Sequence, residues 1–470
     1  MVSWIVIWAR GSQLTILHLP PTDANVGSVE SWSDRLRAHT RVPLYRSAYA
    51  LTSSVVGSAA LGALFWAVAS RIYPPEVVGL STAAVSALLF LTGAGSLNLD
   101  GACVRFLPRA GDATSRFVYL VLGVTTFSAI AAAGIFLLGV HRWAPALDFT
   151  VSSPWTVLAC IGATVASCLL SVQDGALIGL RQSGWVPIKN LALNSAKIVV
   201  LLILSGSLAT YGILVAWVVP SGVAALAVVV LLSRLAQKHR LRTRAAQERL
   251  DRGHVFRYAA GNYAGLLCNL AYRTVPPLLV IHEAGPRAAA FFYPPWLIAT
   301  SLSLLVTNVS VSLVVEGSFD RDRLALHTRR AVRHTARLLL PIALVLVAAA
   351  PWILRIFGEE YAAAGDTLLR LLAIGLVPSS ICILSFGVAR VQDKVRALIA
   401  NQFLLAVLVL TLSWALLPSM GIDGVGVAWL VSQSCVALLL LWTQLLPALR
   451  ATSSSGLGSA GIAIASQSEK

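Results

Sequence analysis

Two cations lie within long apolar stretches of this sequence, and each belongs to a stripe of polar residues at helical spacing. The first stripe consists of Asn190, Asn194, Lys197 and Ser205. The second consists of Tyr258, Asn262, Gly265, Asn269 and Arg273. A charge inside a membrane is costly, so Lys197 and Arg273 each need a partner, a wet cavity or a route to the interface. We expect both cations to face a substrate site.

Few carboxylates share these apolar stretches, which indicates an anionic substrate. A diphosphate group is a natural partner for Lys and Arg in a low-dielectric cavity. We predict that Lys197 and Arg273 hold the anion, with Asn194, Asn262 and Asn269 beside them. An alternative stays open for the asparagines, because such residues often only bond a neighbouring membrane helix.

The other charges near the apolar stretches have plainer interpretations. We expect Arg370 to snorkel towards the membrane surface. Solvent is expected to reach the charges at segment ends, which are Asp100, Arg105 and Asp174. A proton or cation role for His282 and Glu283 is an open alternative.

The composition is that of a polytopic membrane protein. Of 470 residues, 57% are hydrophobic and only 12% are charged, with a mean hydropathy of +0.78. The net charge of +16 does not indicate nucleic-acid binding, because the charges fall between apolar segments. The six cysteines form no Cys-x-x-Cys pair, so a metal site is not supported.

Twelve segments are long and apolar enough to span a bilayer as helices, which predicts an all-α fold. They are 47–70, 77–99, 117–140, 154–173, 186–208, 211–233, 258–281, 288–315, 338–354, 367–389, 397–417 and 424–449. The ninth is the shortest. Pro294 and Pro295 predict a kink in the eighth.

The basic residues predict the topology and the domains. With the N-terminus inside, 29 of the 36 Lys and Arg fall on the cytoplasmic side, four fall outside and three lie within helices. Both termini are therefore expected in the cytoplasm. The expected domains are a disordered tail (1–43), an N-lobe (44–233), a basic hinge loop (234–257), a C-lobe (258–449) and a disordered tail (450–470).

The two halves resemble each other. Gly212-Ile-Leu-Val-Ala-Trp-Val-Val matches Gly424-Val-Gly-Val-Ala-Trp-Leu-Val, and Gly179 corresponds to Gly387. Six helices in each half give both halves the same orientation, so the repeat is parallel. The positions equivalent to Lys197 and Arg273 hold Val409 and Leu61. The two cations are therefore not part of the shared scaffold.

Enzyme signatures are missing from the sequence. It contains neither a phosphate-binding Gly-x-x-x-x-Gly-Lys-Ser/Thr loop nor a His-Glu-x-x-His helix. We therefore expect no enzymatic activity and no cofactor.

Several motifs resemble those of polysaccharide-export flippases, the Wzx-type O-antigen flippases of the multidrug/oligosaccharidyl-lipid/polysaccharide superfamily. They are Leu44-Tyr-Arg-Ser-Ala-Tyr-Ala-Leu, Ala67-Val-Ala-Ser-Arg-Ile-Tyr-Pro-Pro-Glu-Val-Val-Gly-Leu-Ser, Asn98-Leu-Asp and Val104-Arg-Phe-Leu-Pro-Arg. The resemblance covers about residues 44 to 449. It implies two six-helix lobes that pass a polyprenyl-diphosphate-linked glycan across a bacterial inner membrane by alternating access. The first and seventh helices would line the cleft, which adds Arg46 to the predicted site. Membrane lipids, a glycan polymerase and a chain-length regulator would be partners.

Three other functions stay open. An ion-coupled multidrug exporter of the same superfamily would depend on a membrane carboxylate, for which the chain offers Asp100, Asp174 and Glu283. A polytopic glycan polymerase or glycosyltransferase would usually show a long outer loop, which is missing here. A membrane scaffold for glycan enzymes would transport nothing.

Overall fold

The computed structural model describes residues 43–450 except 207, 209, 243–259 and 261–262, and without the side chains of 43–56, 109, 238–242 and 450. All regular elements among the described residues are helices. The first half contains α2 (Pro43–Ile72), α3 (Pro75–Gly95), α4 (Leu99–Phe106), α5 (Thr114–Trp143), α6 (Pro154–Gly179), α7 (Trp185–Leu204) and α8 (Gly212–Arg242). The second contains α10 (Tyr263–Thr274), α11 (Pro276–Phe319), α12 (Leu324–Leu354), α13 (Glu359–Val391), α14 (Val395–Met420), α15 (Ile422–Leu440) and α16 (Leu446–Arg450). Short 3-10 turns and one π-helical turn, Leu441–Leu445, connect or extend them.

Ten described stretches are long and apolar enough to cross a membrane, and they account for eleven of the twelve predicted segments. One stretch, Tyr263–Phe319, holds both the seventh and the eighth segments. They are divided at Gly285, whose φ of +84° interrupts the helix and suits a residue without a side chain. The first segment is α2, of which Gly57–Ile72 is fully described. The predicted all-α, twelve-helix membrane fold is confirmed.

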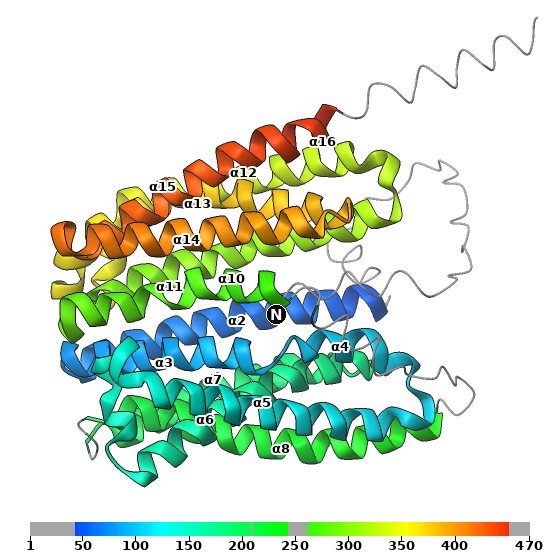
Figure 1. The fold of residues 1–470 in the computed structure, drawn as a ribbon, viewed down its shortest axis with the longest axis horizontal. Coiled ribbons are helices and arrows are strands. Elements are labelled where there is room, and N and C mark those ends of the chain that lie inside the picture. Colours follow the sequence, from blue (N-terminus) through cyan, green and yellow to red (C-terminus); the bar gives the residue numbers. More distant parts are fainter. Residues whose placement is uncertain (1–42, 207, 209, 243–259, 261–262, 451–470) are drawn as a thin grey trace, which may run out of the picture.

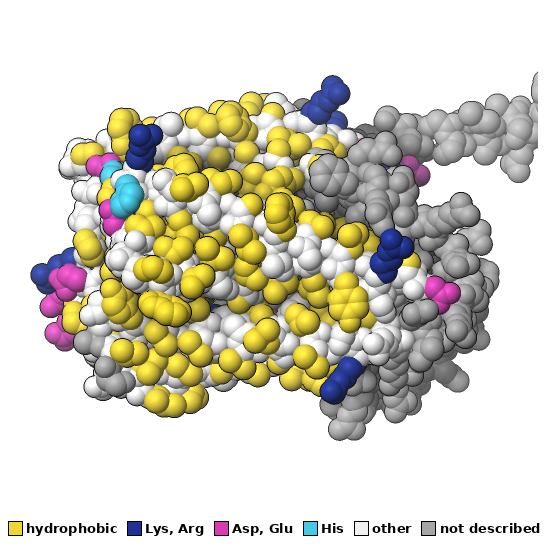
Figure 2. All heavy atoms as spheres, turned by 60° about the horizontal axis from the view of Figure 1, so that its bottom comes forward, with side chains coloured by type: hydrophobic (Ala, Val, Ile, Leu, Met, Phe, Trp, Pro, Cys, Tyr) yellow, Lys and Arg dark blue, Asp and Glu magenta, His cyan; other side chains and the backbone are white. Residues whose placement is uncertain are grey.

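The helices run side by side along the long axis of the molecule (Figure 1). Helices α2–α8 form one half and α10–α16 form the other, and α2 begins at the same end of the bundle at which α16 finishes. We call this the tail end, and its opposite the far end. Apolar side chains dominate the surface between the charged groups at the two ends (Figure 2). This is the surface of a multi-pass membrane protein, because hydrocarbon can solvate apolar groups but not charges.

Two helix boundaries differ from the sequence prediction. Helix α12 begins at Leu324 rather than 338 and is 31 residues long, so the ninth segment is not the shortest. Its polar first half is stable as a helix because its buried residues recur at helical spacing, as Ala325, Thr328 and Ala331 do. Helix α8 likewise continues to Arg242, nine residues past the predicted boundary. Pro294 and Pro295 lie inside α11, whose non-helical residue is Gly285, and a kink at the two prolines stays a prediction.

The proposed hinge and tails are described only in part. Residues 243–259 of the expected hinge, and 1–42 and 451–470 of the expected tails, lie outside the described residues. The role of residues 234–257 as a hinge therefore stays a prediction.

The two halves meet along α3, which packs against α11 and α10. The contact is close because Gly79 has no side chain: a Cβ atom there would lie 1.7 Å from the carbonyl oxygen of Pro286. At the far end, Ser70 and Arg71 donate hydrogen bonds to the carbonyl oxygens of Phe357 (2.9 Å) and Ile356 (3.0 Å). The seam between the halves thus combines close backbone contact, a few hydrogen bonds and buried apolar residues from both halves.

The internal repeat is visible in helix packing. A Cβ atom on Gly179 of α6 would lie 2.5 Å from the carbonyl oxygen of Cys103 on α4. A Cβ atom on the equivalent Gly387 of α13 would lie 2.5 Å from the Ser310 hydroxyl on α11. Small residues of this kind let membrane helices approach each other closely. The same packing contact is therefore built in both halves.

We expect Gly79→Ala to destabilise the seam, because overpacking a tight contact typically costs about 1–3 kcal/mol. Gly134→Ala on α5 is the matched control, since nothing lies within 4 Å of a Cβ atom there. Thermal unfolding of both purified variants in detergent tests this. Equal unfolding midpoints for the two variants would contradict the close approach of α3 and α11.

Candidate functional site

Lys197 lies on α7 and is almost completely buried, with 7% of its surface exposed. Its ammonium nitrogen sits 3.6 Å from the centre of the Trp217 ring on α8. No carboxylate among the described residues pairs with it. A tryptophan face is the most favourable aromatic surface for a cation, and the attraction strengthens when water is excluded. The ring therefore stabilises the charge while leaving N–H donors for an anion.

Trp217 connects this lysine to the second half through a chain of rings. Its ring centre lies 5.4 Å from that of Phe65 and 6.0 Å from that of Trp66, both on α2. Trp66 in turn lies 4.8 Å from Tyr293 on α11. Ring pairs at these distances attract each other beyond their burial. A cation of the first half is thus coupled by packing to a helix of the second.

An apolar cavity of about 340 Å³ also borders Trp217. It lies within the first half, and its walls include Leu88, Phe136, Cys160, Tyr211 and Val218. Apolar walls of this kind suit a hydrocarbon group. A buried cation and an apolar cavity therefore share one tryptophan.

Arg273 lies on α10 and is half-buried. Its Nε atom is buried and has no hydrogen-bond partner among the described residues. The guanidinium carbon lies 5.6 Å from the centre of the Tyr272 ring, whose hydroxyl accepts a hydrogen bond from Asn269 at 2.9 Å. Leaving a buried donor unsatisfied costs about 1–3 kcal/mol or more for a charged group. This arginine therefore has unused capacity to bind an acceptor.

Lys197 and Arg273 each lie near one of two tryptophans that are equivalent in the internal repeat, although neither cation is itself repeated. Tyr272, the neighbour of Arg273, lies 5.7 Å from Trp429, and Trp429 is the repeat equivalent of Trp217. Trp296 packs 4.9 Å from Trp429 and donates a hydrogen bond to the carbonyl oxygen of Arg273 at 3.0 Å. Trp217 thus contacts Lys197, and its equivalent Trp429 contacts Tyr272, the neighbour of Arg273. The repeated Val-Ala-Trp motif was a signal for this that the sequence analysis did not use.

The structure describes only some of the other predicted site residues. Asn194 is half-buried on α7, and no described residue forms a hydrogen bond with its side chain. Asn262 and the side chain of Arg46 lie outside the described residues. Among the described residues, no contact joins Lys197 to Arg273. A common binding site for these residues therefore stays a prediction.

The prediction of a solvated Asp174 is wrong. Helix α6 continues to Gly179, so Asp174 lies more than a turn inside it and is 3% exposed. It forms an ion pair with Lys189 of α7, with side chains 4% and 7% exposed. Asn190 donates to the carboxylate at 3.4 Å, and Lys189 donates to the Leu170 carbonyl oxygen at 3.1 Å. This buried polar cluster joins α6 to α7.

Three further charged residues, Arg370, His282 and Glu283, lie at exposed or partly exposed positions. Arg370 is exposed and bonds Asp366 at 3.1 Å, which agrees with a position near a helix end. His282 and Glu283 lie 3.8 Å apart and are both partly exposed. Within the described part of the chain, no three His, Cys, Asp or Glu residues are grouped to hold a metal ion.

Solved structures with the same architecture are transporters. No protein-family model and no curated protein matches this sequence. The lipid II flippase MurJ, in an inward closed conformation, matches with a TM-score of 0.63, 14% identity, and 86% of this chain and 89% of that chain covered. A multidrug resistance MATE family transporter of the MOP superfamily matches in its inward-facing conformation (TM-score 0.62, 14% identity, 85% and 96% covered). An outward-facing MATE family transporter matches too (TM-score 0.58, 13% identity, 88% and 97% covered). At such identities the likeness shows that this chain shares the fold of these transporters.

We expect Lys189→Met to destabilise the protein by about 3–5 kcal/mol, because it leaves Asp174 buried without a partner. The double variant Lys189→Met with Asp174→Leu should recover most of this loss, since apolar groups replace the pair. Arg287→Gln is the control. It breaks an exposed pair, Arg287 with Glu360 at 3.0 Å, and should cost at most about 1 kcal/mol.

Unfolding of the purified variants in detergent measures these differences. A double variant as unstable as Lys189→Met alone would contradict the assignment of the pair.

Proposed function

We propose that this chain is a flippase that moves a polyprenyl-diphosphate-linked oligosaccharide across the membrane by alternating access, for export of a surface polysaccharide. The observation that carries the proposal is the meeting of a buried cation and an apolar cavity at Trp217. An anionic group attached to a hydrocarbon chain has the chemistry that matches both surfaces.

Lys197 and Arg273 are the residues to which we assign the diphosphate. Lys197 offers ammonium donors from an aromatic platform, and Arg273 offers a guanidinium with an unsatisfied Nε. Hydrogen bonds between charged donors and phosphate oxygens are roughly twice as strong as those between neutral groups. Asn194, Asn262, Asn269 and Arg46 would surround the headgroup, and the lipid chain would stay in apolar surroundings.

Alternating access requires two halves that move as bodies. In this structure the halves meet through the contact of α3 with α11 and through hydrogen bonds from Ser70 and Arg71, and these contacts would have to rearrange during such motion. Buried apolar residues of both halves also meet at the seam, so opening it would expose part of both cores. Residues 234–257 would serve as the cytoplasmic hinge between the halves.

A second candidate is an ion-coupled multidrug exporter. The structural likeness to a MATE family transporter supports this candidate equally. The burial of Asp174 also supports it, because ion coupling would need a carboxylate inside the membrane. Lys189 already neutralises that carboxylate, however, so a coupling ion would have to displace the lysine. We therefore favour the flippase.

The cellular setting is part of the same proposal. It places the chain in a bacterial inner membrane with both termini in the cytoplasm. Lipid-linked oligosaccharide and membrane lipids would be its ligands. Association with a glycan polymerase and a chain-length regulator stays a prediction, and so does the lack of enzymatic activity.

A deletion strain tests the function directly. Lipid-linked oligosaccharide is expected to accumulate on the cytoplasmic face of the inner membrane, and surface polysaccharide is expected to be lost. Normal flipping together with increased drug sensitivity would instead favour the exporter.

Removing the two cations tests the site. Lys197→Met and Arg273→Met each remove a charged hydrogen-bond donor, which should weaken headgroup binding by about 10- to 100-fold and abolish export in the double variant. Arg370→Met is the control, because that arginine is exposed and paired with Asp366. Export by complemented deletion strains is measured, with membrane expression checked for each variant. Normal export by the double variant would refute the assignment of these residues.

A further inference from the structure

Helix α12 is longer than the membrane is thick. Its 31 residues extend for about 46 Å, against about 30 Å of hydrocarbon. Its uncharged, apolar part begins at Leu338, so the preceding residues reach the headgroup layer at the tail end. Because these residues are helical and do not form a loop, their side chains have fixed positions relative to the apolar part.

Three arginines form a stripe on this helix that continues directly into apolar residues. Arg330, Arg333 and Arg337 are spaced by three and four positions, and Leu340, Leu344 and Val347 follow at the same spacing. The three arginines, Leu340 and Leu344 are exposed, and Val347 is partly exposed. One face of α12 is therefore cationic at the headgroup level and apolar below it.

The apolar part of this stripe forms one wall of a surface groove of about 660 Å³. Helices α13 and α15 supply the other walls, with Val377 on α13 and with Ser434 and Leu438 on α15. Leu344 and Leu438 are 70% and 59% exposed, so the groove faces the surrounding hydrocarbon. All three helices belong to the second half, and the groove does not involve the seam.

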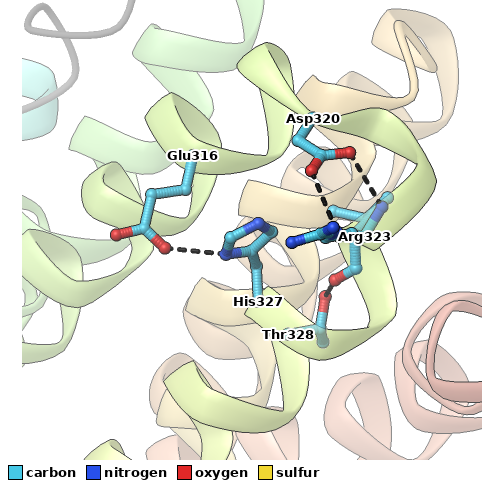
Figure 3. Close-up of polar contacts among 6 residues, drawn as sticks. Glu316, Asp320, Arg323, His327 and Thr328 are labelled. Carbon is cyan, nitrogen blue, oxygen red and sulfur yellow. Dashed lines mark hydrogen bonds and ion pairs between the residues drawn. The ribbon is translucent and has the colours of Figure 1, made fainter. Parts of the chain in front are cut away.

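Three acidic residues near the start of α12, namely Glu316, Asp320 and Asp393, are paired with other basic side chains, and the exposed Asp322 pairs with none of the three arginines of the stripe. The Glu316 carboxylate accepts a hydrogen bond from His327 at 2.8 Å, and Asp320 pairs with Arg323 at 3.4 Å (Figure 3). Asp393 pairs with Arg321 at 2.7 Å, and Arg329 donates to the carbonyl oxygen of Leu449 at 3.0 Å. Among the described residues, no carboxylate pairs with Arg330, Arg333 or Arg337. These three charges are available to an external anion.

We propose that this face of α12 binds an anionic phospholipid, with the phosphate at Arg330, Arg333 and Arg337 and an acyl chain in the groove between α12, α13 and α15. The arginines span about 10 Å along the helix, which is comparable with the depth of a headgroup layer. Basic clusters next to a membrane helix attract acidic lipids. A groove within one half keeps its shape when the halves move, which suits a resident lipid better than a transported one. This proposal does not depend on the flippase function.

The headgroup contact is tested with Arg330→Gln/Arg333→Gln/Arg337→Gln. The control, Arg116→Gln/Lys394→Gln/Arg396→Gln, removes the same charge from other exposed positions at the tail end. Native mass spectrometry of the purified proteins, titrated with phosphatidylglycerol or phosphatidylcholine, measures binding. The unchanged protein and the control should prefer phosphatidylglycerol, and the triple variant should bind it at least about tenfold more weakly. Should the triple variant fail to fold, Arg333→Gln alone should show a smaller loss.

The groove is tested with Ser434→Trp, which fills it without changing a charge. Thr411→Trp on the exposed face of α14 is its control. We expect Ser434→Trp, and not Thr411→Trp, to lose bound phosphatidylglycerol. Undiminished binding by the triple variant or by Ser434→Trp would overturn the proposal. So would displacement of the phospholipid by equimolar polyprenyl phosphate, which would identify the groove as a path for the transported lipid.

Discussion

A charge buried away from water must be stabilised by the protein itself, and this constraint determines where the polar residues of this bundle lie. The chain meets it in three ways. Asp174 and Lys189 neutralise each other between α6 and α7, and Lys197 rests on the ring of Trp217. Arg273 is satisfied only in part, because its Nε has no partner among the described residues. The first arrangement is complete, whereas the other two leave capacity to bind an anion.

The repeat provides the scaffold, and its departures from symmetry provide the chemistry. Trp217 and Trp429 are equivalent, and so are the close contacts at Gly179 and Gly387. The residues attached to those tryptophans differ, because Lys197 contacts one and Tyr272, beside Arg273, contacts the other. Two halves with the same packing but different polar residues can present different groups to one ligand while moving as similar bodies.

Two apolar cavities have different surroundings and therefore suit different lipids. The cavity beside Trp217 lies inside the first half, next to a buried cation. The groove between α12, α13 and α15 opens to the membrane, and its nearest cations lie at the headgroup level. A transported amphiphile must have its headgroup carried across the bilayer, whereas a resident lipid stays in its leaflet. The inner cavity matches the first requirement and the outer groove the second.

The sequence by itself determined the membrane class, the twelve helices and the repeat, because the length and hydropathy of a segment decide whether it can span a bilayer. It also indicated that Lys197 and Arg273 lie within spanning helices. Only the tertiary structure decided what each charge contacts. Asp174 was assigned to solvent because the end of its helix was placed too early, and its partner Lys189 lies on another helix. The basic start of α12 lies outside the spanning segment predicted from hydropathy, since arginines lower hydropathy without preventing a helix from forming. Hydropathy indicates whether a single segment is more stable in the membrane or in water. Ion pairs, ring contacts and grooves depend instead on which segments pack against each other in the fold.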